Sequence, residues 1–576
     1  MIKLFGQIFL MLLFFSTVAS ARDKINNIFI NTGKVFERSD SDWFFASPFL
    51  NSLHITTKKY IIKDELIFRI GNELDEDDFL ETERNLRALG LFTKISIELE
   101  EVSNGLFDVY VETKDKWSLY PGIIVGASGG EYVFGARLKD YNLLGHGIMF
   151  NIDGAKMYKT VSNTTVNNNA DATSKKYDTT GYIGNIELEK KRLFRSELGL
   201  FARAYKTYLS DGQEVIFEKP FRTINTKTSY GISASNSLRN DYFSNKGSIL
   251  FNGVQTDGTV DSNFLRHIDT LKFIKSNEQK AQIWYAKSWQ AIDKVYFSTS
   301  LEWQQSDRMA NVFERVYDNQ SKFLIGFSSV AQTYYTVNNI NAYNHEDLAV
   351  GGWGNVVLGA IFPSNKRGEN GFFYVGAQGE KSYYSKNFYL FGQITASSSF
   401  AREFAKYTYQ EFLGLAFVRL TDKLLFAARI REQASWNYPR MRQLFVDDIR
   451  GIRGYDLQKL SGDNRLVSNF ELRYFPALRI FVMQFSGVAF FDIGSVWNQR
   501  VEDAFLKSRF YSSAGLGLRG HFTKSNNPDH ILRLDIPYNF YTKRFGISLG
   551  VAQYFSAISS HIFKIPTIYS KEFDRE

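Results

Sequence analysis

The chain has 576 residues, with 52 Phe and 32 Tyr but only 9 Pro, and its formal net charge is +8. Aromatic residues favour strands, so this composition indicates many strands, in a chain longer than one ordinary soluble domain. The absence of cysteine excludes disulfides, thiolate metal sites, a cysteine nucleophile and a lipidated cysteine anchor. Beyond the first residues no stretch is apolar enough for a membrane helix, so any crossing of a membrane must use strands.

The N-terminal sequence MIKLFGQIFLMLLFFSTVASA has a basic residue, Lys3, then an apolar run from Leu4 to Val18 and a small-residue cleavage site at its end. This pattern predicts an export signal over residues 1–21 and a mature chain that starts near Arg22. An anchoring helix is the alternative. It is disfavoured because polar residues interrupt the run, which is shorter than the ~20 residues that a membrane span needs.

Residues 48–116 are predicted to form a small α+β unit, after a polar segment at 22–47 that shows no clear amphipathic helix. The unit is acidic, whereas the whole chain is basic. A short strand around Leu53 to Thr57 precedes two helices, in KKYIIKDELIF and DEDDFLETERNLRALG. KISIELE and LFDVYVET then alternate strictly around Asn104-Gly105, which predicts a hairpin. The order strand, helix, helix, strand, strand leaves a sheet edge free to pair with an extended polypeptide.

From residue 117 to residue 555 the chain consists of segments of about ten residues that alternate apolar with polar, which is the signature of membrane barrel strands. In HILRLDIPYNF, for example, Leu532 and Ile536 lie on one face, and Arg533 and Asp535 lie on the other. One face suits lipid and the other a polar lumen, whereas charges on this many inward faces exclude a dry sandwich core. About twenty candidate strands are present, and they must close into a barrel because hydrocarbon cannot satisfy an open edge.

Long polar stretches at 159–177 and 240–279 predict extracellular loops, and short connections such as Thr421-Asp422 predict periplasmic turns. By this orientation the stretch DDIRGIRGYDLQKLSGDN is also an extracellular loop. Its glycines allow tight backbone paths, and Arg453 carries planar bidentate donors. If the loop folded into the lumen, Arg453 would need a carboxylate partner. Strand parity turns Glu471 and Asp492 toward the lumen, where an inserted Arg453 could reach them. Gly494 follows Asp492 on the same face of its strand. The alternative is a solvated loop arginine.

Five motifs follow one another in the second half of the chain: GIRGY, SNFELRYFP, FFDIGSVW, GLGLR and RFGISLGVAQYF. In this order they resemble the barrel motifs of the BamA/TamA superfamily of outer-membrane proteins, also called bacterial surface antigens. ETERNLRALGLF is similar to part of a single POTRA domain, and RLKDYNLLGHG resembles the turn after the second barrel strand. The resemblance covers nearly the whole mature chain. It implies an all-β transmembrane antiparallel barrel of the bacterial outer membrane, preceded by one small periplasmic α+β domain.

The resemblance also implies a set of site residues. Gly451, Arg453, Gly454 and Tyr455 belong to a loop that docks inside the barrel, with Arg453 against Glu471 and Asp492. The first and last barrel strands, near 119–125 and 544–555, are expected to pair weakly and to part for a client strand. Two features depart from the family. Its barrels usually have sixteen strands, whereas about twenty candidates are present here. Its chains usually end at the last aromatic residue of the barrel, whereas here a tail at 556–576 follows, in the periplasm or at the seam.

This resemblance implies an assembly or insertion factor without cofactor or nucleic acid. It would capture unfolded outer-membrane or secreted polypeptides by β-augmentation at the POTRA-like edge and template them at the barrel seam. Outer-membrane lipid and accessory lipoproteins are the other expected partners. One alternative is a polypeptide translocator of the two-partner secretion type, which usually carries two POTRA domains and a plug helix. A passive porin is the other, and it would need neither the small domain nor the docking loop.

An enzyme is disfavoured by the sequence. Residues 126–130, GASGG, fit the G-x-S-x-G pattern of a nucleophile elbow, but a strand, YVFGARL, follows where that motif requires a helix. The seven histidines show no spacing typical of metal ligands. No catalytic or metal residue is therefore predicted.

Overall fold

The computed structural model describes residues 23–557 and 565–569, apart from interior segments. These are 37, 39–46, 104, 129–130, 163–175, 194–195, 208–209, 222–225, 243–272, 291–292, 309–318, 342, 344–345, 365–370, 402–403, 438–443, 458–459, 481–482, 498–504 and 523–530. The predicted export signal lies outside the described residues. The chain divides into two compact units. Unit 1 holds the residues up to Tyr120 with Leu138–Phe150 and Glu189–Ser196, and unit 2 holds the rest.

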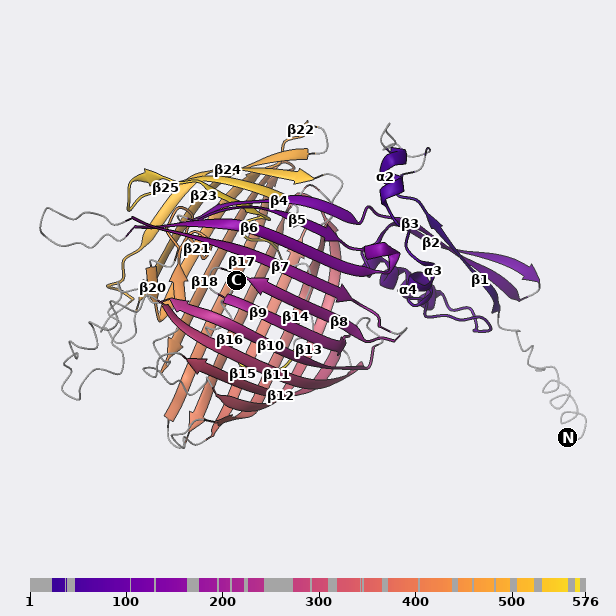
Figure 1. The fold of residues 1–576 in the computed structure, drawn as a ribbon, viewed down its shortest axis with the longest axis horizontal. Coiled ribbons are helices and arrows are strands. Elements are labelled where there is room, and N and C mark those ends of the chain that lie inside the picture. The colour runs from indigo at the N-terminus through magenta and orange to yellow at the C-terminus, as the bar shows by residue number, and fades with distance from the viewer. Residues whose placement is uncertain are drawn as a thin grey trace, which may run out of the picture. The chain divides into compact units, whose positions relative to one another are not determined.

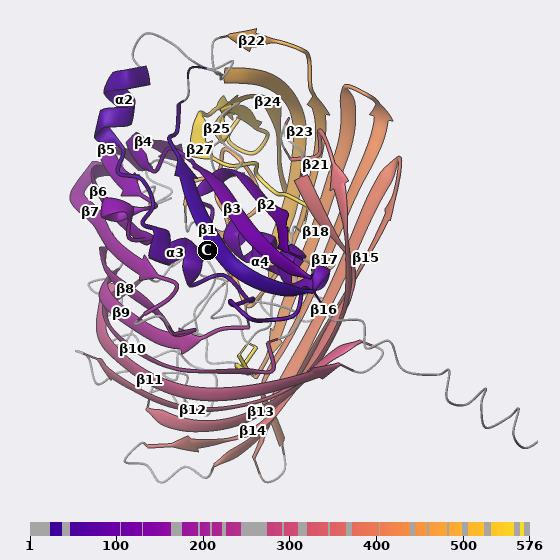
Figure 2. The same cartoon turned by 90° about the vertical axis from the view of Figure 1, so that its right-hand side faces the viewer.

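The N-terminal part of unit 1, residues 24–116, is a small domain built on a three-stranded sheet (Figure 2). Its strands are β1 (Lys24–Gly33), β2 (Phe92–Ser103) and β3 (Leu106–Asp115), in the order β1-β3-β2. β1 is parallel to β3 and β2 is antiparallel to it. The helices are α2 (Ser47–Leu53), α3 (Lys59–Lys63) and α4 (Glu76–Ala88). Apolar side chains from the sheet, α3 and α4 form one buried cluster that includes Ile25, Ile62, Leu86, Val109 and Val111.

Two sequence predictions for the small domain were wrong. The domain starts at Lys24 and not at Pro48, because β1 joins its sheet. A bulge between Ile25 and Asn27 breaks the alternation that would otherwise have indicated this strand. The strand expected at Leu53–Thr57 is absent from these described residues, and α2 ends there instead. The second helix and the two following strands are confirmed, and of the hairpin turn only Gly105, with φ +75°, is described.

Unit 1 also contains the short helix η1 (Leu143–Gly145) and the segment 189–196, and both contact the small domain. Lys58 N donates to Gly145 O at 2.9 Å. Arg192 makes a two-point ion pair with the buried Glu65, at 2.6 and 2.9 Å. A two-point pair of this kind restricts orientation as well as distance, so it fixes the small domain on these turns within the unit.

Unit 2 is a closed antiparallel barrel (Figure 1). Within the described part of the chain, twenty strands form it, and the two-residue segments β22 (Arg479–Ile480) and β26 (Arg544–Phe545) are attached to it at turns. The count of about twenty made from the sequence is therefore confirmed, and the sixteen implied by the resemblance is wrong. The first ten strands are β4 (Leu119–Ser128), β5 (Glu131–Asp140), β6 (Ile148–Ser162), β7 (Lys176–Lys190), β8 (Gly199–Lys206), β9 (Ser210–Lys219), β10 (Thr228–Tyr242), β11 (Phe273–Gln290), β12 (Lys294–Arg308) and β13 (Gln320–Val337). The other ten are β14 (Glu346–Pro363), β15 (Phe372–Ser385), β16 (Phe388–Ala401), β17 (Phe404–Thr421), β18 (Leu424–Trp436), β21 (Asn464–Tyr474), β23 (Met483–Trp497), β24 (Tyr511–Phe522), β25 (Ile531–Asn539) and β27 (Ser548–Val551).

The barrel strands have the two faces that the alternation predicts. On β25, Leu532 and Ile536 are exposed on the outer face, whereas Asp535 is fully buried on the lumen side. On β16, Ile394 is exposed and Thr395 is buried. The outer face is therefore apolar and suits lipid, while the lumen face is largely polar. Among the helices that the structure describes, none is long and apolar enough to span a membrane.

The strands extend further into the predicted loops than the sequence indicated. β6 runs to Ser162 and β7 starts at Lys176, and β10 runs to Tyr242 before β11 starts at Phe273. The residues between these ends lie outside the described part of the chain. The short turn predicted at Thr421-Asp422 does connect β17 to β18.

Candidate functional site: an arginine loop docked in the barrel lumen

The connection between β18 and β21 folds into the barrel. It contains a small hairpin of β19 (Leu444–Val446) and β20 (Leu460–Gly462), and a turn at residues 447–455, called here the RGY loop. Asp447 begins the turn, because its Oδ1 accepts hydrogen bonds from the backbone N–H groups of Ile449 and Arg450. Gly451 and Gly454 have φ angles of +130° and +83°, which L side chains rarely adopt.

Arg453 is fully buried and contacts carboxylates from three strands. Its Nε and Nη2 donate to the two oxygens of Asp492 on β23, at 2.8 and 2.9 Å. Its Nη1 donates to Glu471 on β21 at 2.8 Å and to Asp535 on β25 at 3.5 Å. The structure thus brings Arg453 together with both carboxylates nominated from the sequence, and it adds Asp535 as a third.

The guanidinium of Arg453 also lies over two aromatic rings. Its Cζ is 3.6 Å from the ring centroid of Phe490 and 4.3 Å from that of Tyr554. Phe490 belongs to β23, whereas Tyr554 comes from the chain after the last strand. The Tyr554 hydroxyl donates to Asp448 O at 3.0 Å and accepts from Gly451 N at 3.1 Å. Aromatic faces stabilise a cation that water cannot reach, so both rings support the buried charge.

Two further buried arginines share these carboxylates. Arg473 Nε donates to Glu471 at 2.8 Å, and Arg519 Nη1 donates to Asp535 at 2.7 Å. With Arg453, three buried cations share three carboxylates, which compensates the charges that burial would otherwise penalise. Removing Arg453 would leave Asp492 without the partner of its two-point pair.

Asn469 on β21 connects the loop backbone to this network. Its Nδ2 donates to Asp492 Oδ1 and to Gly451 O, both at 2.7 Å. Arg429 on β18 in turn donates to Asn469 Oδ1 from Nε and Nη2, at 3.0 and 2.7 Å. The amide is thereby held in one orientation, with its oxygen toward the arginine and its nitrogen toward the loop.

Gly494 and Tyr455 complete the set of residues singled out in the sequence. Gly494 lies on β23, where an added Cβ would stand 2.8 Å from Leu466 O and 3.2 Å from Ile452 Cδ1. Its lack of a side chain leaves room for the loop at this point. Tyr455 is buried, and its hydroxyl donates to Ser512 O at 3.0 Å.

Sequence reasoning missed several residues of the site, among them Asp535, the arginines that share its carboxylates, and Tyr554. The inward parity of Asp535 was visible in HILRLDIPYNF, but parity alone does not separate it from other inward carboxylates. Tyr554 was assigned to the last barrel strand. The structure corrects this, because it lies in the lumen beside Arg453.

The strand that closes the barrel is short. β27 ends at Val551, and the chain then leaves the wall at Ala552, with φ +63°. The predicted last strand, 544–555, is therefore wrong at its C-terminal end. The reason is that lumen groups hold the following residues: Arg473 Nη2, for example, donates to Phe555 O at 2.7 Å.

The described register between β27 and β4 is Leu549 opposite Ala127. β13 and β14, by contrast, pair without interruption from Gln320 opposite Pro363 to Val337 opposite Glu346. β27 itself is four residues long, so it is much shorter than the ten-residue β4 beside it.

The serine of the G-x-S-x-G pattern stands between two strands. Ser128 is the last residue of β4, and β5 starts at Glu131, so a strand follows the G-x-S-x-G serine. No group of three or more His, Asp or Glu side chains in this part of the chain could hold a metal ion.

No protein-family model and no curated protein sequence matches the chain. Among solved structures, BamA from Haemophilus ducreyi lacking POTRA domains 1–3 aligns with a TM-score of 0.39 and 11% identity, over 91% of this chain and 83% of that chain. CdiB from Escherichia coli aligns with a TM-score of 0.41 and 12% identity, over 92% of this chain and 76% of its own. The FrpB iron transporter from Neisseria meningitidis reaches 0.38 with 7% identity, over 82% and 86%.

Proposed function

We propose that this protein is an outer-membrane factor that assembles or inserts client polypeptides at its barrel seam. The observation that supports this most is the length of the last strand: β27 has four residues, whereas β4, which it meets at Leu549 opposite Ala127, has ten. A backbone polar group without a partner costs several kcal/mol in hydrocarbon. An arriving strand that pairs with β4 would recover these bonds, and its folding would supply the free energy.

The small domain offers a second edge. β2 is twelve residues long and, among the described residues, pairs with β3 alone. The outer edge of β1 is partly occupied, because Ile25 N donates to Asn72 O at 3.0 Å and Gly71 N donates to Ile25 O at 2.8 Å. β2 is therefore the strand that an extended client would join by β-augmentation, with the small domain in the periplasm.

A passive porin is less well supported than a factor of this kind. The RGY loop is anchored inside the lumen by buried ion pairs, and residues 552–557 enter the same space. A translocator that passes a secreted polypeptide through the lumen would have to move part of this material aside. Insertion at the seam would not.

The test is a disulfide that locks the seam. Opposite residues of antiparallel strands have Cα atoms about 4.5–5.5 Å apart, within disulfide range, and the chain contains no cysteine of its own. An Ala127→Cys, Leu549→Cys variant in phospholipid vesicles is expected to lose insertion of a urea-unfolded outer-membrane barrel protein when oxidised, and to regain it with reductant. A matched lock in the wall, Phe327→Cys with Val356→Cys, is expected to leave insertion unchanged.

Full insertion by the oxidised seam variant would refute the proposal. Passage of a secreted polypeptide into vesicles that carry the locked variant would favour the translocator instead.

A further inference from the structure

Residues Ile565–Tyr569 of the C-terminal tail lie along the inner wall of the barrel. Ser300 Oγ on β12 donates to Pro566 O at 3.0 Å. Ser397 Oγ on β16 donates to Tyr569 O at 2.8 Å, and Tyr569 N donates to the Tyr374 hydroxyl on β15 at 2.7 Å. Side chains from three strands therefore bind backbone groups at both ends of this segment. The tail was expected in the periplasm or at the seam, and these residues lie in neither place.

The side chains of the segment cover an apolar part of the wall. Ile568 and Tyr569 pack against it, and Asn355 Nδ2 on β14 donates to the Tyr569 hydroxyl at 2.7 Å. Water in an open lumen would hydrate this surface unfavourably, so covering it stabilises the docked segment. The apolar part of the wall consists of Leu324, Val357, Ile361, Phe372, Tyr374 and Tyr407.

The wall is also shaped to the path of the segment. A Cβ on Gly376 of β15 would stand 2.9 Å from Tyr569 Cδ2, and one on Gly326 of β13 would stand 3.2 Å from Pro566 Cβ. Two strands thus place glycine where the tail passes close to their backbone.

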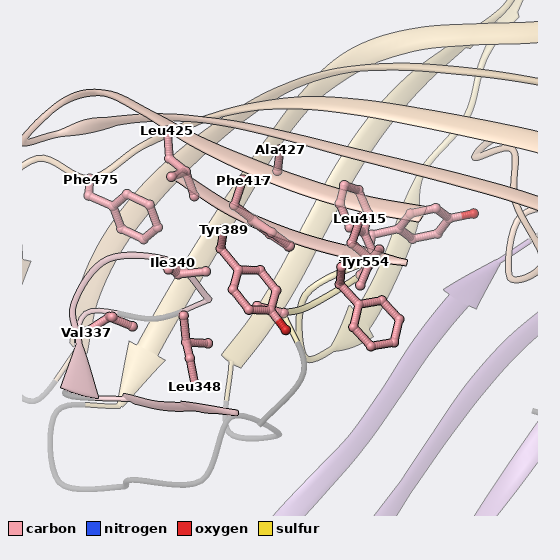
Figure 3. Close-up of a cluster of buried hydrophobic side chains, with 13 residues drawn as sticks. Val337, Ile340, Leu348, Tyr389, Leu415, Phe417, Leu425, Ala427, Phe475 and Tyr554 are labelled. Carbon is pink, nitrogen blue, oxygen red and sulfur yellow. The ribbon is translucent and has the colours of Figure 1, made fainter. Parts of the chain in front are cut away.

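The tail is held a second time nearer to β27. Gln553 Nε2 donates to Asn341 O at 2.7 Å, and Ala557 N donates to Asn341 Oδ1 at 3.0 Å. Figure 3 shows Tyr554 in this second apolar cluster of the lumen, with side chains such as Tyr389 and Leu415. The chain after β27 is therefore bound inside the barrel at two separate places.

We propose that the inner face of β12–β16 is a binding site for an extended peptide, and that the chain's own segment Ile565–Tyr569 is its ligand and plugs the lumen. Among the described residues, the segment is held by hydrogen bonds between neutral groups, with apolar contacts beside them. The segment can therefore leave without exposing a buried charge. This inference goes beyond the proposed function, because a plug restricts passage through the lumen whether or not the seam accepts clients.

The experiment compares ion conductance in planar bilayers for the full chain and for a chain truncated after Ala557. The truncated barrel is expected to conduct several-fold more, and a synthetic peptide of residues 558–576 is expected to block it. Tyr374→Phe in the truncated barrel removes one hydrogen bond to the peptide and should weaken the block roughly fivefold. Tyr383→Phe is the matched control, since Tyr383 lies on the same strand but is exposed on the outer face.

Equal conductance of the two chains, or equal block of the Tyr374→Phe and Tyr383→Phe barrels, would overturn the proposal. If the truncated chain does not assemble, the full-length Ile568→Cys variant decides the question, because the chain has no other cysteine. Its reaction with a maleimide should be roughly fivefold faster when Tyr374→Phe is added, and an unchanged rate would count against docking. No client is present in either assay, so failure of the plug is distinguishable from failure of the seam.

Discussion

Two sides of the lumen wall hold their chain segments by different interactions. On β21, β23 and β25 the RGY loop is anchored by buried ion pairs, whereas on β12–β16 the tail segment is bound by neutral hydrogen bonds and apolar contact. Breaking a buried pair costs about 3–5 kcal/mol, because the remaining charge loses its partner. A neutral hydrogen bond contributes about 1 kcal/mol. The charged side is thus suited to permanent attachment and the neutral side to release.

The largest effect is expected at the charged side. Arg453→Met leaves Asp492 without its two-point partner in a fully buried site, so the free energy of unfolding should fall by about 3–5 kcal/mol. Denaturant titration in detergent micelles, followed by the fluorescence of the 8 tryptophans, measures this change. The control is Arg450→Met in the same loop. Arg450 is partly exposed, and the buried Asp447 keeps its hydrogen bonds from two backbone N–H groups, so the loss should be smaller, about 1 kcal/mol. Similar losses for both variants would contradict the comparison.

A smaller loss is expected when the backbone of the RGY loop is disturbed and its charges are kept. Gly451→Ala places a Cβ 2.6 Å from Val467 Cγ1 at a φ of +130°, which should cost about 1–3 kcal/mol. Gly487→Ala on β23 is the matched control, because nothing lies within 4 Å of its added Cβ. It should change stability by less than about 0.5 kcal/mol. The same titration applies, and a tolerated Gly451→Ala would show that the loop can shift.

On β12–β16, where the tail is bound by neutral hydrogen bonds, a methyl group added beneath the tail should release the tail rather than unfold the barrel. Gly376→Ala places a Cβ 2.9 Å from Tyr569 Cδ2 and 2.5 Å from the Tyr374 hydroxyl, whereas Gly379→Ala on the same strand meets nothing within 4 Å. We expect Gly376→Ala to expose Ile568→Cys to maleimide while the barrel loses less than about 1 kcal/mol, since the tail can move away. A large loss of stability without faster labelling would show that the tail is a fixed part of the wall.

The smallest effect is expected from one hydroxyl. Tyr569→Phe removes only the hydrogen bond from Asn355 and keeps the ring on the apolar wall. Tail docking should weaken by about 1 kcal/mol, read as a roughly fivefold faster maleimide reaction at Ile568→Cys. Tyr541→Phe is a suitable control, because its side chain is exposed outside the tail site. An equal rate increase in the control would show that the hydrogen bond from Asn355 does not hold the tail in place.

Strand parity was sufficient to turn Glu471 and Asp492 toward the lumen, because a period of two fixes the face of every side chain on a strand. It could not select Asp535, which has the same inward parity. Only the tilt and register of the strands decide which inward carboxylate lies at the depth of Arg453, and these depend on pairing across the whole barrel.

The tail shows a different limit. Nothing local in IPTIY indicates the lumen, because its partners Ser300, Asn355 and Ser397 lie on strands far away in the sequence. β1 was missed for a local reason, since one bulge was enough to break its alternation. Patterns with a fixed period are therefore readable from the sequence, whereas binding between distant segments is not.

The position of Val551 has a mechanical consequence. It is the last residue of β27, and the chain that enters the lumen continues directly from it. A force that draws the tail out of the barrel is therefore transmitted along the backbone to a four-residue strand whose described partner on β4 is a single residue. Pulling on the tail would therefore act first on the pairing between β27 and β4, where the barrel closes.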